Sequence, residues 1–302
     1  MPAPTPNINY PVVPAKTIVT RAKSSGWFGM NYNMNIYRGC SHGCIYCDSR
    51  SDCYRDPDFD TVKVKKDALR IIRDDLRRKV KPGVVATGAM SDPYNPLEAE
   101  LKITRNALEL LNAYGFGIAI DTKSPLVVRD IDILKDIAEH SPVLVKVTIT
   151  TADDALSRRI EPHVAPSSAR FAALHRLADA GIFCGVLLMP LLPYLTDTEE
   201  NIREIVRRAS ESGARFVYPS FGVTMRDGQR EYFCTRLEEI RPGLGTKYLS
   251  RFGTRYHCPS PNKALWDCFK EECGRLGLLY NMRDIVSGYK MGYGDAQLTF
   301  FD

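Results

Sequence analysis

The sequence predicts an α/β fold, a partial (β/α)6 barrel of the TIM type followed by a C-terminal extension. Strand-like and helix-like runs alternate at intervals of roughly 30 residues, which is the size of one βα unit. The strand-like runs are largely apolar and do not alternate with polar residues, as expected for parallel strands covered by helices. The alternation ends after about Gly222. We therefore predict an N-terminal extension over residues 1–30, the barrel over 31–222 and a C-terminal extension over 223–302.

The helices are predicted from the spacing of apolar residues and from signals at their ends. They cover 66–80, 103–114, about 171–180, about 196–213 and, in the tail, 262–276. In the first of them, Leu69, Ile72 and Leu76 recur on one face. In the fourth, Thr196 and Glu199 have the spacing of a capping box, so this helix should begin at Thr196.

The strands are predicted from short apolar runs that lie between these helices. They are 84–87, 116–121, 143–150, 183–189 and 215–218, with one more near 34–37. In barrels of this type the functional residues lie at the carboxyl ends of the strands. Polar residues that directly follow these runs are therefore the first candidates for a site.

Composition excludes several classes of protein. No apolar run is long enough to span a bilayer, and the first residues lack the pattern of an export signal, so we expect a cytoplasmic protein with no membrane partner. Nine cysteines, an odd number, argue against a disulfide framework. A net charge of +5 permits nucleic-acid binding but does not by itself indicate it. The clearest basic stretch, 70–81, is interpreted as a solvated helix face.

Three cysteines lie within eight residues, and this cluster is the most informative feature of the sequence. Cys40, Cys44 and Cys47 have C-x3-C-x2-C spacing on a glycine-containing loop. Soft thiolates this closely spaced select zinc or an iron–sulfur cluster. A structural zinc site needs a fourth ligand, which His42 or a distant cysteine would have to supply. Three thiolates would instead leave one iron of a [4Fe-4S] cluster open, and S-adenosylmethionine (SAM) could chelate that iron through its amino and carboxylate groups.

The motif C-x3-C-x-aromatic-C resembles the signature of the radical SAM superfamily. The resemblance implies an enzyme that holds a [4Fe-4S] cluster through Cys40, Cys44 and Cys47. Such an enzyme cleaves SAM reductively to a 5′-deoxyadenosyl radical and needs an electron donor such as flavodoxin or ferredoxin. The resemblance also implies that Tyr46 packs near the adenine of SAM. The fold of the superfamily agrees with the partial barrel predicted from the alternation of strands and helices.

Polar residues follow three of the predicted strands. Ser91 and Asp92 follow the second strand, Lys123 follows the third, and Thr148 and Thr150 end the fourth. A cationic amine and hydroxyls suit a ligand with a carboxylate and a ribose. We expect Ser91 and Lys123, with Asp92 beside them, to bind SAM at its carboxylate. Thr148 or Thr150 should contact the ribose, and ordinary loop capping is the alternative for each residue.

Residues 36–197 further resemble the spore photoproduct lyase-like group, also called DNA repair photolyase-like. The resemblance rests on Tyr37-Arg38-Gly39-Cys40, His42-Gly43-Cys44, Ser91-Asp92-Pro93-Tyr94, Thr122-Lys123-Ser124 and Pro190-Leu191-Leu192-Pro193 leading to Asp197. It implies a nucleic-acid lesion or base as substrate. In that group a cysteine just ahead of the Ser-Asp pair returns hydrogen, together with a tyrosine after the last cluster cysteine. Here these positions hold Ala89 and Met90, and Asp48. Cys53 and Tyr54 are the candidate replacement donors, and ordinary loop residues are the alternative.

Other interpretations stay open at this point. The enzyme could modify a small molecule or a peptide, or the chain could be a non-enzymatic zinc-binding nucleic-acid module. Residues Gln297 to Phe301 resemble the peptide that binds the bacterial sliding clamp, with a tail folded on the barrel as the alternative. Cys258, Cys268 and Cys273 are either ligands of an auxiliary cluster or buried thiols.

Overall fold

A computed structural model of the chain describes residues 10–79 and 81–293. Its main feature is a seven-stranded sheet in the order β10-β9-β8-β7-β6-β3-β2. The strands are β2 (Val19–Arg21), β3 (Tyr32–Met34), β6 (Val84–Thr87), β7 (Gly117–Thr122), β8 (Val143–Thr148), β9 (Cys184–Leu188) and β10 (Phe216–Pro219). All neighbours are parallel except β2 and β3. Within the described residues β2 and β10 remain the two edges, so the predicted partial barrel is confirmed.

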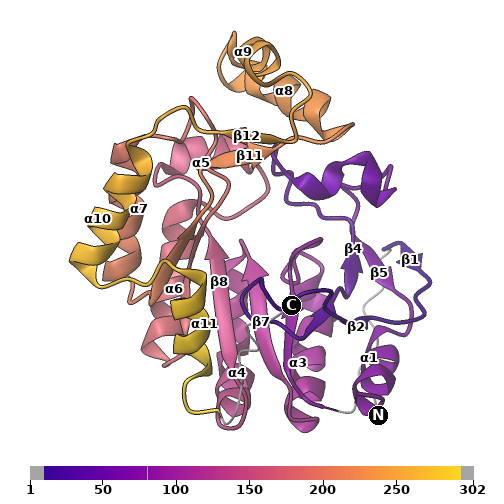
Figure 1. Cartoon of the computed structure of the whole chain (residues 1–302). Helices are drawn as coiled ribbons and strands as arrows, with labels where there is room; N and C mark the ends of the chain where they lie inside the picture. The colour runs from indigo at the N-terminus through magenta and orange to yellow at the C-terminus, as the bar shows by residue number, and fades with distance from the viewer. Residues whose placement is uncertain (1–9, 80, 294–302) are drawn as a thin grey trace.

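Helices cover the outer face of this sheet (Figure 1). They are α1 (Ala68–Arg77), α2 (Glu98–Leu101), α3 (Ile103–Ala113), α4 (Ile131–Ala138), α6 (Ser167–Asp179), α7 (Glu199–Glu211) and α10 (Leu265–Leu276), with a 3-10 helix at Pro125–Asp130. Helix α5 (Asp154–Ile160) packs instead in a separate core with Ile45 and Tyr46. Strand β8 shows why its sequence is apolar throughout. Val145 and Val147 pack in the outer core under the helices, while Leu144 packs in a second core on the inner side. Both faces of the strand are buried, as in other parallel sheets.

The inner side of the sheet is filled from both ends of the chain. Phe28 is fully buried and packs with Phe216 of β10. Helix α11 (Met282–Lys290) lies beside it, where Tyr289 donates a hydrogen bond to the carbonyl of Phe28 at 2.7 Å. Figure 1 shows α11 in front of β8. These contacts close the inner side without an eighth strand.

A small C-terminal unit lies over the carboxyl ends of the barrel strands, at the top of Figure 1. It consists of α8 (Gln229–Ile240), α9 (Leu244–Phe252) and the antiparallel pair β11 (Gly222–Thr224) and β12 (His257–Pro259). Its apolar core includes Phe233 and Tyr248, and it also takes in Ile45 and Tyr46 of the cysteine loop. A separate three-stranded sheet, β1 (Val12–Val13), β5 (Lys63–Lys65) and β4 (Tyr37–Arg38), leads into that loop. Two 3-10 turns, Asp48–Arg50 and Asp52–Tyr54, follow it.

Several expectations need correction. The strand predicted near 34–37 is two strands, because the chain leaves the barrel after Met34 and pairs with β5 from Tyr37. Helix α7 is capped by Thr198, whose hydroxyl accepts from the amide of Asn201, while the hydroxyl of Thr196 accepts from the amide of Leu192. Helices α2, α4, α5, α8, α9 and α11 were not predicted. No helix of the described part is long and apolar enough to cross a membrane. Residues 297–301 lie outside the described residues.

Candidate functional site

The three clustered cysteines lie on a loop that follows β4, and its conformation requires glycine at its start. Gly39 has φ of +75°, and a Cβ there would collide with the carbonyl oxygens of Phe59 and Thr61. The amide of Cys40 donates to the carbonyl of Phe59 at 2.7 Å. Ser91, after β6, donates its hydroxyl to the carbonyl of Gly39 at 2.5 Å. The loop is therefore fixed on two sides just before Cys40.

The middle of the loop packs against the segment after α5. Gly43 has φ of +67°, and a Cβ there would lie 2.9 Å from the imidazole of His163. The amide of Ile45 donates to the carbonyl of Ile160 at 3.0 Å, and the amide of His163 donates to the carbonyl of His42 at 3.2 Å. Two segments far apart in sequence, one after β6 and one after α5, thus hold the same short loop.

Cys44 is buried, while Cys40 and Cys47 are half-buried. Burial raises the pKa of the Cys44 thiol well above its ordinary value, against the opposing charge of Lys123, and the charges of Cys47 and Cys40 raise it further. The described residues contain no group of three His, Cys, Asp or Glu side chains placed around one metal ion. An iron–sulfur cluster is held by cysteine thiolates, and the three thiols of this loop are donors of that kind.

Tyr46 is fixed by a buried ion pair. Its hydroxyl donates to Glu161, and the other carboxylate oxygen of Glu161 accepts from Arg170 at 2.5 Å. Glu161 and Arg170 are fully buried. Arg170 also donates to the carbonyls of Ala165 at 2.7 Å and Thr148 at 3.0 Å. Although burial alone would raise the pKa of Glu161, the charge of Arg170 lowers it below its usual range. The network joins α5, α6 and the end of β8 to the cysteine loop.

Asp92 joins the loops after β6 and β7. Its carboxylate accepts from the Thr122 hydroxyl at 2.8 Å, from the Lys123 amide at 2.8 Å and from the Tyr94 amide at 2.9 Å. His42 lies 3.5 Å from the same carboxylate. The hydroxyl proton of Ser91 and the oxygens of Asp92 are therefore used within the protein. These contacts position the loops, and the expected contact of the two residues with the SAM carboxylate stays a prediction.

Lys123 is different, because its ammonium has no hydrogen-bond or carboxylate partner among the described residues. It lies 5.7 Å from the centre of the Tyr46 ring. Burial acts to lower the pKa of Lys123, but the charges of Cys44 and Glu161 raise it above its ordinary value. A charged ammonium beside three thiols and without a fixed partner is suited to bind the carboxylate of a ligand.

The two candidate threonines are both buried, at the end of β8 and just beyond it. The hydroxyl of Thr150 has no hydrogen-bond partner in the described structure, whereas its carbonyl accepts from Asn201 at 3.1 Å. Buried hydroxyls are normally satisfied, so this oxygen is a candidate contact for a ligand. Thr148 lies two residues earlier and contributes its carbonyl to Arg170.

Sequence reasoning missed an ion pair on the inner side of the barrel. Lys146 of β8 is fully buried and lies 2.7 Å from Asp121 of β7, with its ammonium 4.4 Å from the Phe28 ring. A single charged residue inside the apolar run 143–148 was the available signal. Since Lys123 acts on the charge of Asp121, this pair lies near the site.

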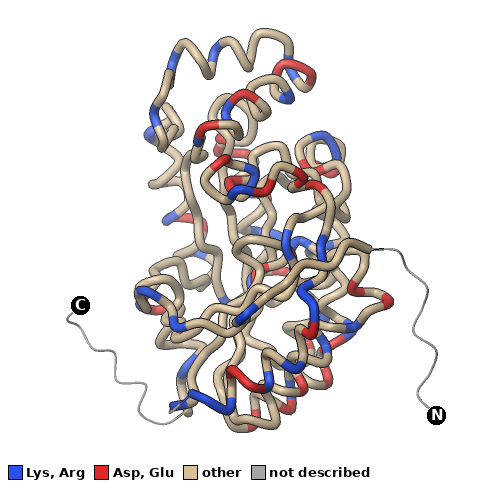
Figure 2. The backbone as a smooth tube through the Cα atoms, turned by 90° about the vertical axis from the view of Figure 1, so that its right-hand side faces the viewer, with Lys and Arg blue, Asp and Glu red and all other residues tan. Residues whose placement is uncertain are grey.

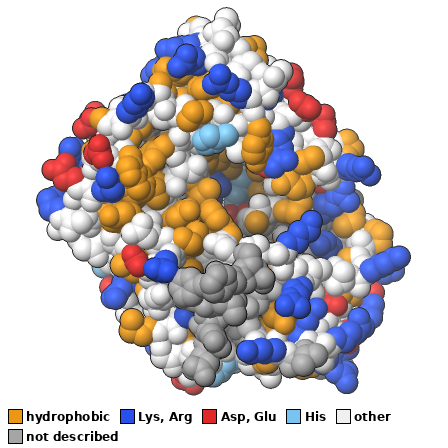
Figure 3. All heavy atoms as spheres, viewed as in Figure 1, with side chains coloured by type: hydrophobic (Ala, Val, Ile, Leu, Met, Phe, Trp, Pro, Cys, Tyr) orange, Lys and Arg blue, Asp and Glu red, His pale blue; other side chains and the backbone are white. Residues whose placement is uncertain are grey.

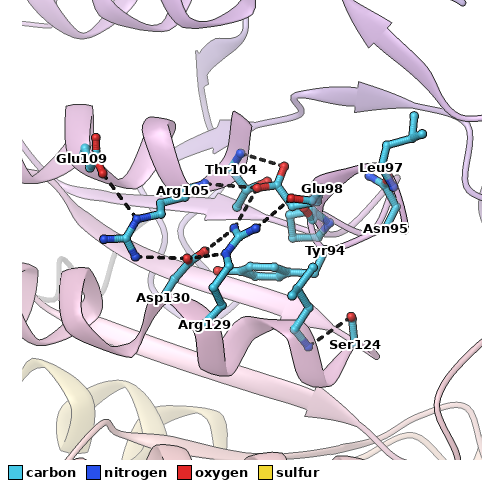
Figure 4. Close-up of polar contacts among 12 residues, drawn as sticks. Tyr94, Asn95, Leu97, Glu98, Thr104, Arg105, Glu109, Ser124, Arg129 and Asp130 are labelled. Atoms are coloured by element: carbon cyan, nitrogen blue, oxygen red, sulfur yellow. Dashed lines mark hydrogen bonds and ion pairs between the residues drawn. The ribbon is translucent and has the colours of Figure 1, made fainter. Parts of the chain in front are cut away.

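A second network of buried charges is centred on Glu98, Arg129 and Asp130 (Figure 4). Glu98 and Asp130 are fully buried and are bridged by Arg129, at 2.9 Å and 2.7 Å. Tyr37, three residues before Cys40, donates its hydroxyl to Glu98 at 2.5 Å. Nothing in the spacing of these residues indicated the network, which joins elements 61 residues apart in sequence.

A pocket of about 260 Å³ lies on the outer side of the loop. Its lining comprises Asn35, Tyr37, Arg38, Gly39, Ser49, Tyr54, Asp56, Phe59, Lys65, Met90 and Ser91. The structure thus brings Tyr54 together with Met90 and Ser91. Cys53 is exposed and lies outside this lining, with its sulfur 3.1 Å from the Ser51 hydroxyl and 3.7 Å from Arg226. On the face shown in Figure 3 the surface is also hollowed near its centre, with hydrophobic side chains around the hollow.

The remaining cysteines of interest lie in two separate cores. Cys258 packs with the C-terminal unit, whereas Cys268 and Cys273 of α10 pack in the main core. All three are buried, and burial raises the pKa of Cys273 to about 12. This placement favours buried thiols over an auxiliary cluster.

Comparison with known proteins agrees with this geometry. The family model described as the Radical SAM superfamily matches residues 34–218. An uncharacterized protein of Mycobacterium tuberculosis is 32% identical over 248 residues, covering 80% of this chain and 73% of that protein. An uncharacterized protein of Methanocaldococcus jannaschii is 33% identical over 178 residues, covering 58% of this chain and 66% of that protein.

Solved structures show the same fold at low identity. A spore photoproduct lyase variant with bound AdoMet and dinucleoside spore photoproduct aligns with a TM-score of 0.65 and 15% identity, covering 88% of this chain and 79% of that chain. The radical S-adenosylmethionine methyltransferase TsrM from Kitasatospora setae, with cobalamin and a [4Fe-4S] cluster bound, aligns with a TM-score of 0.53 and 12% identity, covering 81% and 52%.

Proposed function

Because the chain belongs to the radical SAM superfamily, we propose that Cys40, Cys44 and Cys47 hold the [4Fe-4S] cluster of a SAM-cleaving enzyme. The protein is a radical SAM enzyme, and its cofactors are a [4Fe-4S] cluster and SAM. When bound, the cluster supplies the electron that splits SAM and yields a 5′-deoxyadenosyl radical. The observation that carries the ligand assignment is the three-thiol loop, fixed at the carboxyl ends of the barrel strands by Gly39 and Ser91.

The surrounding side chains have distinct proposed roles. Lys123 binds the SAM carboxylate, since its ammonium lacks a partner in the described structure. Tyr46 packs against the adenine, and the Glu161–Arg170 pair orients it. The hydroxyl of Thr150 or of Thr148 contacts the ribose, which is supported by the unsatisfied hydroxyl of Thr150.

For the substrate, we propose a lesion or a base in a nucleic acid. The solved lyase that shares this fold holds a dinucleoside photoproduct, and we transfer only that chemical class to this chain. The hydrogen donor must differ, because Ala89 and Met90 precede the Ser-Asp pair where that group has its cysteine, and the carboxylate of Asp48 is held by Arg226 at 2.9 Å. We propose Tyr54, which lines the pocket beside Met90, with Cys53 next to it in sequence, as the donor pair.

The cluster assignment is tested by anaerobic reconstitution with iron and sulfide. The protein is then incubated with SAM and dithionite, which replaces a physiological donor such as flavodoxin or ferredoxin, and 5′-deoxyadenosine is measured by mass spectrometry. We expect the nucleoside from wild-type protein and none from the Cys40→Ala, Cys44→Ala, Cys47→Ala variant. The matched control changes Cys258, Cys268 and Cys273 to Ala and should keep the product. One zinc bound in place of iron would contradict the proposal.

The substrate class is tested in the same assay. A nucleic-acid substrate predicts that ultraviolet-irradiated oligonucleotides increase the yield of 5′-deoxyadenosine, whereas unirradiated strands and peptides do not. With an oligonucleotide that reacts, the nucleic-acid product formed by the Tyr54→Phe variant should differ from that formed by wild type. An increase with peptides alone would favour the other class of substrate.

A further inference from the structure

One segment of the chain contains several basic residues and no acidic residue. Residues 240–266 contain five Lys or Arg and no Asp or Glu. The rest of the chain holds 36 basic and 36 acidic residues, and within it residues 70–81 form another basic stretch, with six Lys or Arg and two Asp. It comprises α9, the exposed turn after it and β12 (Figure 2, top).

Three of the five basic side chains of this segment, those of Arg251, Arg255 and Lys263, are exposed. The buried face of α9 consists of Leu244, Gly245, Tyr248 and Phe252. Arg251 lies on the exposed face, and Arg255 and Lys263 lie in exposed stretches beyond it. None of these three forms an ion pair with a carboxylate in the described part of the chain. A structural role in folding therefore does not account for their charge.

The segment also leads to the cysteine loop. Tyr256 is 50% exposed, next to Arg255, and its hydroxyl accepts from the guanidinium of Arg226 at 3.0 Å. Arg226 in turn forms an ion pair at 2.9 Å with Asp48, which directly follows Cys47. A ligand that lies along Arg251, Arg255 and Tyr256 would thus reach the rim of the proposed cofactor site.

We propose that Arg251, Arg255 and Lys263 bind the phosphates of a single strand of nucleic acid, and that Tyr256 stacks on one of its bases. This inference rests on the proposed function, because it identifies where the proposed substrate docks. Charge complementarity favours a polyanion, and guanidinium groups suit phosphate in particular. An exposed aromatic side chain among basic residues is the pattern by which proteins bind single strands. An acidic protein partner, such as an electron donor, would use the charges but not the stacking.

The test measures binding and does not need turnover. Reconstituted protein is titrated anaerobically into fluorescein-labelled single strands of DNA and of RNA, each of about 16 nucleotides. Fluorescence anisotropy gives the dissociation constant at salt concentrations from about 50 to 200 mM. The variant changes Arg251, Arg255 and Lys263 to Gln. The matched control changes Arg70, Arg73 and Arg77 of α1 to Gln and removes the same charge from another face.

Each phosphate contact contributes about 0.7 to the slope of log K against log salt for single strands. Losing three contacts should lower the slope by about 2 and weaken binding about 100-fold at 0.1 M salt. The α1 variant should bind like wild type. Tyr256→Leu should weaken binding without changing the salt dependence. Tyr256→Phe should bind strands as tightly as wild type. The DNA and RNA arms identify the kind of strand.

Three outcomes would overturn the inference. The first is that wild-type protein does not bind strands. The second is that the two triple variants lose equal amounts of binding affinity. The third is that the Arg251, Arg255, Lys263 variant binds strands normally but is reduced more slowly by flavodoxin. The last would assign the surface to an acidic protein. Failure of the proposed function is a separate result, namely no 5′-deoxyadenosine from a protein that still binds strands.

Discussion

Removing the guanidinium of Arg170 should both destabilise the fold and disturb the SAM site. In the Arg170→Met variant the carboxylate of Glu161 stays fully buried but loses its ion-pair partner. The carbonyls of Ala165 and Thr148 each lose a donor as well. Breaking a buried pair by removing one partner costs about 3–5 kcal/mol, because an uncompensated charge remains inside the protein.

Thermal unfolding of the reconstituted protein, followed by circular dichroism, measures this cost. For a chain of this size, 1 kcal/mol corresponds to roughly 2 °C in Tm, so we expect a decrease of about 6–10 °C. The double variant Arg170→Met, Glu161→Gln removes the buried charge and keeps an acceptor for Tyr46. It should recover about 2 kcal/mol relative to the single variant, as coupled neighbours do. A single variant as stable as wild type would refute the assignment of a buried pair.

The pH dependence of stability tests the same prediction independently. In wild type the pKa of Glu161 is lowered below 4.5, so the pair stabilises the fold fully above that pH and loses this contribution as the pH falls through the lowered value. Without Arg170, burial raises the pKa, and the penalty for the ionised carboxylate disappears on acidification. The difference in stability between wild type and Arg170→Met should therefore narrow from about pH 7 to about pH 5. A difference that widens over this interval would contradict the argument.

Three further predictions concern single residues. Lys123→Met should weaken SAM binding about 10- to 100-fold, as expected for one charge-assisted hydrogen bond, with Lys123→Arg closer to wild type in equilibrium dialysis. Ser91→Ala removes the hydrogen bond to Gly39 and should lower the free energy of unfolding by about 1 kcal/mol and speed cluster loss to a chelator. Brief treatment of the reconstituted protein with N-ethylmaleimide should give one adduct, at the exposed Cys53, absent in Cys53→Ser and without effect on SAM cleavage in the absence of substrate.

The barrel could be predicted from sequence because parallel strands covered on both sides are apolar throughout and are separated by amphipathic helices. The prediction was weaker where this physics does not apply. Helices α8 and α9 pack on the cysteine loop instead of on the sheet, so no repeat of βα units announced them. The cap of α7 was placed at Thr196 by motif spacing, but the hydroxyl of Thr196 serves the amide of Leu192 instead.

The candidate site, like the fold, was predictable from sequence only in part. The spacing of Cys40, Cys44 and Cys47 is local, so it could be read directly from the sequence. The partners of Tyr46 could not, because Glu161 is 115 residues away and becomes a neighbour only when α5 packs on the loop. The same is true of Asp92, whose oxygens are used by residues on three loops. Local motifs therefore identify which chemistry is present, while long-range packing decides which side chains remain available to a ligand.

The net charge of the whole chain does not show where basic residues gather on its surface. A net charge of +5 over 302 residues is mild and does not argue for nucleic-acid binding. The basic stretch that stands out in the sequence, 70–81, contains two Asp among six Lys or Arg, and Arg70 lies 3.3 Å and 3.7 Å from Asp67 and Asp74. The segment 240–266 is less dense in basic residues but contains no acidic residue, and Arg251, Arg255 and Lys263 form no ion pair in the described part of the chain, so their charge is not cancelled by a contact. A phosphate backbone responds to that uncancelled local charge, and for this reason the C-terminal unit, and not the basic helix, is where we expect a strand to bind.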